Sequence, residues 1–218
     1  FLDSPFSVKF THRVSFTRRL FRAENHALTQ ALNGGEPRVV AFVDDGVLRA
    51  RPTLERELRE RLELDASAPR LVGFYPVPGG EASKNDRSVA DLVVQVVDQH
   101  HICRRSWVLA IGGGAVLDAV GYGAAVAHRG VRLVRIPTTV LAQDDAGLGV
   151  KNAINRFGKK NFEGTFAVPW AVLNDADFLL TLADREWRRG FSQAGKIARL
   201  KNRGLLEGDG AQGGRSRP

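Results

Sequence analysis

Three consecutive glycines near the middle of the chain are the residues whose type and spacing first suggest chemistry. Gly112–Gly114 follow the apolar run Val108–Ile111 and precede a small-residue segment, Ala115–Ala127, that carries one acid, Asp118. A strand that ends in glycines and reopens as a helix exposes backbone N–H groups and a positive helix end, which bind anions such as phosphates. The strict glycine spacing of the dinucleotide fingerprint is absent. An ordinary tight turn therefore stays open as a second explanation.

Polar residues beyond the glycines favour a ligand site. A second apolar run, Val131–Ile136, stops at Pro137, and Thr138 and Thr139 follow it. The carboxyl ends of strands are where open parallel sheets bind ligands. A group of charged and amide side chains comes next, among glycines: Asp145, Lys151, Lys159, Lys160 and Asn161. Together these residues outline a nucleotide or phosphate site.

A further acid, Asp44, follows the buried run Val39–Val43. An acid at the tip of the first strand of a nucleotide-binding sheet can accept hydrogen bonds from a ribose hydroxyl. The next two residues are Asp45 and Gly46, and an Asp-Gly pair also forms turns without any ligand. Both explanations of Asp44 stay open from the residues alone.

Five motifs in this order resemble one family, the dehydroquinate synthase-like sugar phosphate cyclases. The motifs are the GGG-x-x-x-D turn ending at Asp118, Arg129-Gly130 before a strand, Pro137-Thr138-Thr139, the segment from Asp145 to Lys151, and Gly158-Lys159-Lys160-Asn161. The turn Gly80-Glu81-Ala82-Ser83-Lys84 also matches the G-E-x-x-K turn of the family. The resemblance covers roughly Arg38 to Lys196.

The resemblance implies an NAD-dependent lyase that closes a carbocycle from a phosphorylated keto-sugar. In the family, NAD transiently oxidises one hydroxyl, phosphate is eliminated, the ketone is reduced again, and an aldol addition closes the ring. A divalent metal, normally zinc, grips the substrate hydroxyls as a Lewis acid. The residues around Lys151–Asn161 look closer to the valiolone-type cyclases than to the shikimate-pathway enzyme. A heptulose phosphate and a heptulosonate phosphate therefore both stay open as substrates.

The resemblance also implies which residues do this work. It implies that NAD is held by Asp44, Glu81, Lys84, Gly113, Gly114, Asp118, Thr138, Thr139, Lys160, Phe178, Leu179, Leu180 and Thr181. It implies that the catalytic residues facing the substrate are Arg129, Asp145, Lys151, Asn161 and Lys196. Lysine suits phosphate and carboxylate oxygens because it presents a point charge.

The metal ligands of the family are not matched. Gly190–Lys196 aligns with the family's G-x-x-E-x-x-K, so Gln193 stands where a metal-binding Glu belongs, and an amide is a poor zinc ligand. The last histidine is His128, and the five histidines show no ligand spacing. We therefore expect a cyclase truncated near residue 200, with no zinc ligands in place and no activity as this chain.

The elements that must position these residues alternate between strands and helices. We expect an edge strand, a short helix and then alternating elements, at Phe6–Phe16, Asn25–Leu32, Val39–Val43, a helix with Leu54, Leu58 and Leu62, Leu71–Val77, Asp86–His101, Val108–Ile111, Ala115–Ala127, Val131–Ile136 and Ala171–Leu173. This order predicts an α/β, Rossmann-like fold with a mainly parallel sheet and helices on both faces.

Three segments follow as expected domains. Residues 1–180 would form the NAD-binding domain. Residues 181–202, with a helix at Arg185–Leu200, would be the first helix of a truncated helical domain. The glycine-rich segment 203–218 would be a disordered tail.

Composition limits the partners. The 218 residues carry a net charge of +8 and no aromatic-interleaved basic stripe, so anionic metabolites explain the charge better than nucleic acid or a membrane does. No run of eighteen apolar residues occurs, and we expect a cytoplasmic protein.

The single cysteine, Cys103, excludes an internal disulfide, and its apolar neighbours favour a buried thiol. The family resemblance makes a homodimer a further expectation.

Two other classes of function stay open. A non-catalytic NAD-binding or scaffold protein is favoured by Gln193 and by the missing histidines. A relative of the iron- or zinc-dependent alcohol dehydrogenases is favoured by the GGG-x-x-x-D turn and Pro-Thr-Thr, which those enzymes share. The Lys151–Asn161 cluster and the pair of Glu81 and Lys84 weigh against the dehydrogenase class.

Overall fold

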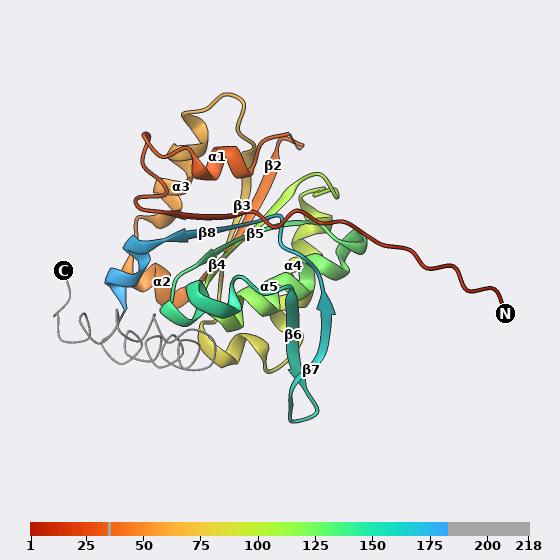
Figure 1. The fold of residues 1–218 in the computed structure, drawn as a ribbon. Coiled ribbons are helices and arrows are strands. Elements are labelled where there is room, and N and C mark those ends of the chain that lie inside the picture. Colours follow the sequence, from red (N-terminus) through yellow and green to blue (C-terminus); the bar gives the residue numbers. More distant parts are fainter. Residues whose placement is uncertain (35, 183–218) are drawn as a thin grey trace, which may run out of the picture.

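The computed structural model describes residues 1–34 and 36–182, and its centre is a six-stranded sheet in which every pair of neighbours is parallel (Figure 1). The order across the sheet is β1-β8-β5-β4-β2-β3. These strands are β1 (Val14–Thr17), β2 (Arg38–Asp44), β3 (Arg70–Val77), β4 (Trp107–Gly112), β5 (Arg132–Pro137) and β8 (Ala171–Asp175). The predicted Rossmann-like parallel sheet is confirmed.

Helices cover both faces of this sheet because the central strands are apolar on both sides. In β2, Val40 and Phe42 pack against α4 and α5, whereas Val39, Ala41 and Val43 pack toward α1 and α3. Figure 1 shows α1 and α3 on one side of the strands and α4 and α5 on the other. Within the described residues the α-helices are α1 (Ala27–Ala31), α2 (Asp45–Ala50), α3 (Leu54–Glu63), α4 (Ser88–Gln99) and α5 (Gly114–Val126).

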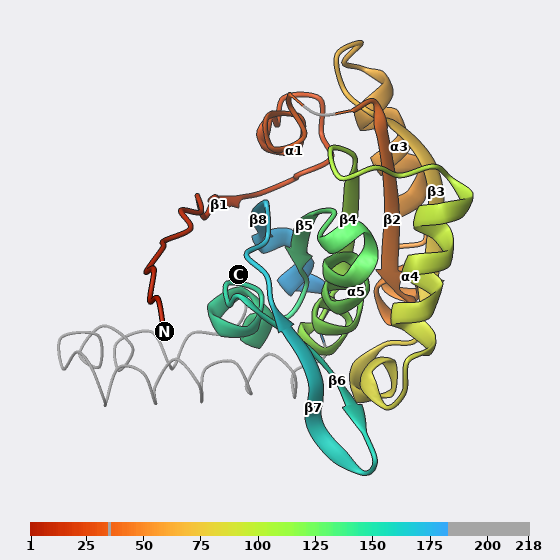
Figure 2. The same ribbon diagram turned by 90° about the vertical axis from the view of Figure 1, so that its right-hand side faces the viewer.

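A two-stranded hairpin stands apart from the sheet (Figure 2). Its antiparallel strands are β6 (Lys151–Arg156) and β7 (Lys159–Phe166), with Arg156 opposite Lys159. Phe157 and Gly158 form the two-residue turn and both have positive φ, 52° and 71°, as tight hairpin turns require. No strand was expected between Ile136 and Ala171, so both strands are a correction to the expected elements. A phenylalanine in the left-handed region is uncommon, so the turn carried no recognisable signal.

Other expectations need smaller corrections. The first strand begins at Val14 rather than Phe6, and α1 is shorter than expected. The helix α2 was not expected, because no apolar periodicity marks its six residues and none of them is buried. The thiol of Cys103 is exposed rather than buried, because it lies in the loop after α4.

Part of the expected architecture lies outside the described residues. This applies to the helix at Arg185–Leu200, to Gln193 and Lys196 within it, and to the tail at 203–218. Within residues 1–34 and 36–182, no helix combines the length and the apolar character needed to cross a membrane.

The parallel sheet gathers all its strand ends at one edge. Chain order reverses next to β2: β3 lies on one side of it, and β4, β5 and β8 follow one another on the other side. The carboxyl ends of β2 and β4 therefore flank the topological switch point, which is where open α/β sheets bind ligands. Asp44 ends β2 and Gly112 ends β4.

Candidate dinucleotide and substrate site

The glycine turn at the switch point leaves N–H groups without a helical partner at the start of α5. The first hydrogen bond of the turn runs from the Leu117 N–H to the Gly113 carbonyl at 3.1 Å, so the preceding N–H groups have no partner within the helix. A Cβ at Gly112 would lie 2.9 Å from Val116, and one at Gly114 would lie 2.9 Å from Ala146. These two glycines are therefore required by packing.

Gly113 differs from its two neighbours. Its φ of −73° and ψ of 172° are open to any residue, and a Cβ there would meet Thr139 at an ordinary 3.4 Å. The fold does not need glycine at this position. The missing side chain instead leaves a cradle at a positively polarised helix end, which is the form of an anion site.

Asp44 lies beside this cradle and has a structural task. Its Oδ1 accepts a hydrogen bond from the Gly46 N–H at 2.8 Å and caps α2. A Cβ at Gly79 would collide with the same oxygen, so the turn after β3 packs directly on the carboxylate. The capping explanation is thus established, and among the described residues no hydrogen bond occupies Oδ2. That oxygen is available to a ribose hydroxyl.

Asp45 is a residue of this region that the sequence analysis missed as a site residue. Its carboxylate accepts from the Gly79 N–H at 3.1 Å and pairs with Arg49 at 2.8 Å. The hydrogen bond with Arg49 is the main cause that lowers the pKa of Asp45. Asp45 therefore ties the turn after β3 to α2. Its position next to Asp44 was the only signal in the sequence.

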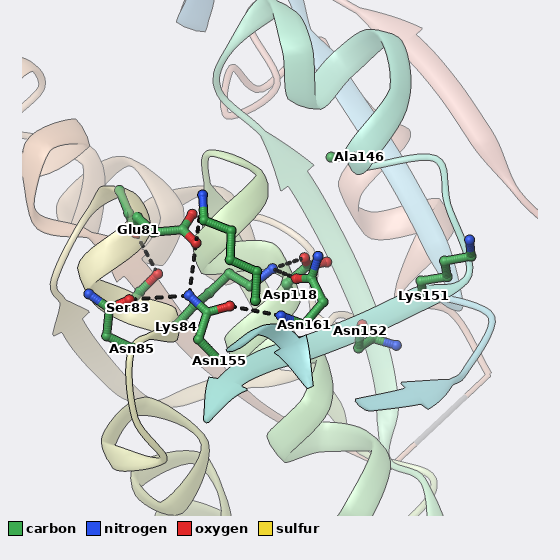
Figure 3. A network of polar contacts seen from close by, with 12 residues as sticks. Glu81, Ser83, Lys84, Asn85, Asp118, Ala146, Lys151, Asn152, Asn155 and Asn161 are labelled. Carbon is green, nitrogen blue, oxygen red and sulfur yellow. Dashed lines mark hydrogen bonds and ion pairs between the residues drawn. The ribbon is translucent and has the colours of Figure 1, made fainter. Parts of the chain in front are cut away.

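Lys84 and Asp118 form the charged centre of the site (Figure 3). The Lys84 Nζ lies 2.6 Å from Asp118 Oδ2 and 2.6 Å from Asn161 Oδ1. Lys84 is buried, being only 6% exposed, so this pairing offsets the cost of removing its charge from water. Burial raises the pKa of Asp118, while the hydrogen bond from Lys84 acts in the opposite direction.

Asn155 joins the two sides of this network, and the sequence analysis did not single it out. Its Nδ2 donates to Glu81 Oε1 at 2.8 Å and to Asn85 Oδ1 at 3.1 Å. Its Oδ1 accepts from the Asn161 N–H at 2.9 Å. Lys160 reaches Glu81 at 3.8 Å. A single amide on a strand carries no functional signal in a sequence, which explains why it was missed.

Lys151 and Asp145 belong to the neighbouring part of the site. Lys151 begins β6, and Figure 3 shows its ammonium pointing away from Lys84 and Asp118. Asp145 lies in a short π-helical turn, Ala142–Ala146, after Thr139. Both residues are exposed, so a ligand arriving from solvent can reach them.

Arg135 binds the carbonyl groups at the end of this π-helical segment and just after it. The sequence analysis did not name it as a site residue. Its side chain is fully buried, and its Nη1 donates to the carbonyls of Gly147 and Gly149 at 3.0 and 2.7 Å. Its Nη2 donates to Asn152 Oδ1 at 2.6 Å. Burial lowers the pKa of Arg135 to about 10, so the guanidinium stays charged at neutral pH. An arginine inside an apolar strand was a signal that could have identified it.

The two threonines after β5 are placed by backbone contacts. The Thr138 N–H donates to the Gly112 carbonyl at 3.0 Å, which fixes β5 against the glycine turn. The Thr139 Oγ1 accepts from the Ala142 N–H at 3.2 Å. Thr138 is buried, and Thr139 is half-buried beside Gly113. Both therefore lie beside the glycine turn, and their role in holding a cofactor stays a prediction.

The segment Phe178–Thr181 is part of a 3₁₀ helix after β8, Ala176–Thr181. Phe178 is fully buried and meets Phe21 edge to face at 6.2 Å. Its ring therefore belongs to the core, and its expected contact with a cofactor stays a prediction. Leu180 is 53% exposed, and Leu179 is half-buried. The Thr181 hydroxyl donates to the Phe178 carbonyl at 2.7 Å.

Arg129 lies away from the other expected site residues. It ends the short turn Ala127–Arg129 after α5, just before β5 begins. The glycine cradle is at the other end of α5, a 13-residue helix and hence about 20 Å long. Within one chain, Arg129 therefore lies at the opposite end of α5 from Gly113, and its expected contact with the substrate stays a prediction.

No metal centre is formed by the part of the chain that the structure describes. Within residues 1–34 and 36–182, no group of three or more His, Cys, Asp or Glu side chains could hold a metal ion. The residue aligned with a metal-binding Glu, Gln193, lies outside this part.

Comparisons with known proteins agree with this geometry. The family model described as 3-dehydroquinate synthase N-terminal matches residues 74–189. The 3-dehydroquinate synthase of Paracoccus denitrificans is 38% identical over 173 residues, which are 78% of this chain and 45% of that protein. The 2-epi-5-epi-valiolone synthase of Streptomyces glaucescens is 35% identical over 199 residues, which are 90% of this chain and 49% of that protein.

The solved structures include a 2-epi-5-epi-valiolone synthase from Streptomyces hygroscopicus subsp. jinggangensis with NAD⁺ and Zn²⁺ bound. It matches with a TM-score of 0.82 and 29% identity, covering 96% of this chain and 56% of that one. An iron-containing alcohol dehydrogenase from Thermotoga maritima shares the fold alone, at a TM-score of 0.57 and 14% identity over 84% of this chain and 51% of that one. The chain spans about half the length of the curated relatives it matches. With the family model covering more than half of its residues, the chain belongs to the 3-dehydroquinate synthase-like sugar phosphate cyclases.

Proposed function

We propose that this chain supplies the NAD-binding part of a 3-dehydroquinate synthase-like cyclase, which converts a phosphorylated keto-sugar into a carbocycle. One observation carries the proposal. At the start of α5, at the switch point of a parallel sheet, N–H groups without a helical partner lie beside Gly113, a glycine that the fold itself does not require. The NAD⁺ bound in the structure of the related valiolone synthase supports the same cofactor here.

The residues around the cradle fit a dinucleotide. The unpartnered N–H groups of α5 and the positive helix end would receive a pyrophosphate, and Asp44 Oδ2 would receive a ribose hydroxyl. Glu81, Lys84, Asp118 and Lys160 would surround the cofactor, together with the residues Gly114, Thr138, Thr139, Leu179, Leu180 and Thr181. When bound, NAD would accept a hydride from the carbon that bears one substrate hydroxyl and later return it.

The substrate side of the proposal rests on Asn161, Lys151 and Asp145. Lys151 offers an exposed positive charge for phosphate or carboxylate oxygens, and Asn161 is held at the network by Lys84. Lys196 is included from the resemblance alone, because it lies outside the described residues. A heptulosonate phosphate and a heptulose phosphate are the two candidate substrates. The curated relatives include both a 3-dehydroquinate synthase and a 2-epi-5-epi-valiolone synthase.

The proposal includes no step through a metal. Zn²⁺ is named for the related valiolone synthase, and the described residues of this chain offer no ligand set for it. The inactivity of this chain by itself stays a prediction that rests on Gln193. Phosphate release from a heptulose phosphate with NAD and added zinc measures it, and detectable turnover would contradict it.

Two further parts of the proposal concern the setting of the protein. Because dinucleotides and sugar phosphates are kept inside cells, we place the protein in the cytoplasm.

A homodimer is supported by the N-terminal arm, which extends away from the body and carries the exposed, alternating residues Phe6, Val8 and Phe10 (Figure 1). Sedimentation of the chain with and without its first ten residues tests the dimer.

The test of NAD binding uses Gly113→Ala. Calorimetric titration of the wild-type chain should give saturable NAD binding, and the variant should bind at least about tenfold more weakly because its methyl group fills the cradle. Its unfolding midpoint should not change. Gly149→Ala is the matched control, because a Cβ there would meet nothing nearer than 3.8 Å. Absent wild-type binding, or equal binding by the Gly113 variant, would refute the proposed site.

A further inference from the structure

We propose that Asn155 couples the cofactor-binding turn, Gly80–Lys84, to the hairpin residue Asn161. Asn155 is a positioning residue. A ligand that contacts Glu81 would change the backbone conformation of Asn161, and a ligand that contacts Asn161 would change the position of Glu81. The inference rests on the proposed function in one respect: the proposed function assigns Glu81 to the cofactor side of the site and Asn161 to the substrate side. The contact geometry that carries it is independent of any ligand.

The amide of Asn155 has no free orientation. It is 8% exposed, its Nδ2 donates to Glu81 and Asn85, and its Oδ1 accepts from the Asn161 N–H. A flipped amide would point its oxygen at two acceptor oxygens and its NH₂ group at a donor, losing all three bonds. The side chain is therefore locked in one arrangement by partners from two separate segments.

The bond to Asn161 holds an uncommon backbone conformation. Asn161 has a φ of 52°, the left-handed region that a non-glycine residue adopts at a cost. In this conformation its side-chain oxygen reaches Lys84 at 2.6 Å. Without Asn155, the Asn161 N–H would lose its acceptor, and the preference for extended backbone would draw Asn161 away from Lys84.

The contacts close into a ring. Glu81 and Lys84 lie on one turn, Asn155 and Asn161 lie on the hairpin, and hydrogen bonds join Glu81 to Asn155 and Lys84 to Asn161 (Figure 3). A ligand that draws Glu81 Oε1 away from Asn155 would break this bond, and the change would reach Asn161 through one hydrogen bond. Coupling of this kind is reciprocal, so a ligand at Asn161 would change NAD affinity by the same factor.

The experiment uses Asn155→Asp, which keeps the acceptor for the Asn161 N–H but turns the donor that faces Glu81 into a second carboxylate. We expect NAD to bind at least about tenfold more weakly to this variant, a loss of ~1.4 kcal/mol. In the double variant Asn155→Asp/Glu81→Gln, the introduced glutamine amide can donate to the new carboxylate, and affinity should return to that of Glu81→Gln. Asn33→Asp, at an exposed position in the turn after α1, is the control for adding a negative charge. A double variant that binds NAD more weakly than Glu81→Gln alone would overturn the coupling.

A second readout needs no NAD and separates this inference from the proposed function. In the ligand-free chain, the exposed substitution Glu81→Gln should shift the amide resonance of Asn161 when Asn155 is present and should not shift it in an Asn155→Ala background. Hydrogen exchange of that amide should be at least about tenfold faster in Asn155→Ala and unchanged in Asn155→Asp. If NAD fails to bind but these shifts occur, the cofactor assignment fails and the coupling stands. If Glu81→Gln leaves the Asn161 amide unmoved in the wild-type background, the coupling is wrong.

Discussion

Replacing Arg135 by Met should destabilise the fold and loosen the substrate side of the site together. The guanidinium is fully buried and forms no ion pair with a carboxylate among the described residues. It bonds instead to carbonyls of the segment that follows the π-helical turn, at Gly147 and Gly149, and to the side chain of Asn152. Methionine keeps most of the stem and removes every donor.

The size of the effect follows from two opposing contributions. The three closest acceptors would be left buried without a donor, and each such group costs about 1–3 kcal/mol. Against this, the charge no longer has to be buried: the lowering of the Arg135 pKa to about 10 corresponds to roughly 3 kcal/mol that the substitution returns. We therefore expect a net loss of about 3 kcal/mol in the free energy of unfolding.

Urea unfolding followed by tryptophan fluorescence measures this loss. Arg70→Met is the matched control, because Arg70 starts an edge strand of the same sheet, is exposed, and forms no side-chain hydrogen bond among the described residues. Arg135→Lys should fall in between, since an ammonium keeps the charge but cannot reach several carbonyls at once. A loss below about 1 kcal/mol for Arg135→Met, or one no larger than that of Arg70→Met, would refute the role assigned to these hydrogen bonds.

Three shorter predictions follow from the same packing and charges. Gly121→Ala would drive a Cβ into Asn152 Oδ1, so it should cost about 1–3 kcal/mol in urea unfolding, and an unchanged midpoint would contradict the close approach. A tyrosine hydroxyl and then an arginine lower the pKa of Glu163, so its stabilisation is present above the ordinary value of 4.5 and is lost as pH falls through the lowered one. Glu163→Gln should therefore flatten the acid side of the stability profile, and a profile as steep as wild type would count against this. Burial raises the pKa of Asp118 above 3.8 while Lys84 opposes the rise, so the carboxyl ¹³C titration of Asp118 should move to still higher pH in Lys84→Met. A titration that stays in place or moves down would show that the pair is not formed.

Matched control variants accompany two of these three predictions. Gly149→Ala serves for Gly121→Ala, because it adds the same methyl group in open surroundings. Glu63→Gln serves for Glu163→Gln, because Glu63 is exposed and has no hydrogen bond among the described residues. Neither control should reproduce the change expected of its partner.

The sequence by itself determined the sheet and the glycine turn. Apolar runs such as Val39–Val43 and Val108–Ile111 are too short for helices and too apolar for an edge, so they can only be buried strands. The triplet Gly112–Gly114 between such a strand and a helix locates the cradle, because a parallel sheet places every such turn at the same edge. These features depend on residues close together in the chain.

Only the tertiary structure decided which distant residues meet. Asn155 bonds to Glu81 from 74 residues away, and Lys84 reaches Asn161 across 77 residues, so no local pattern could reveal either contact. The positions of two residues that were expected at the site were also decided by packing. Phe178 belongs to the core, and Arg129 lies at the far end of α5. Periodicity specifies which face of an element is buried, whereas the pairing of polar groups depends on how those elements pack.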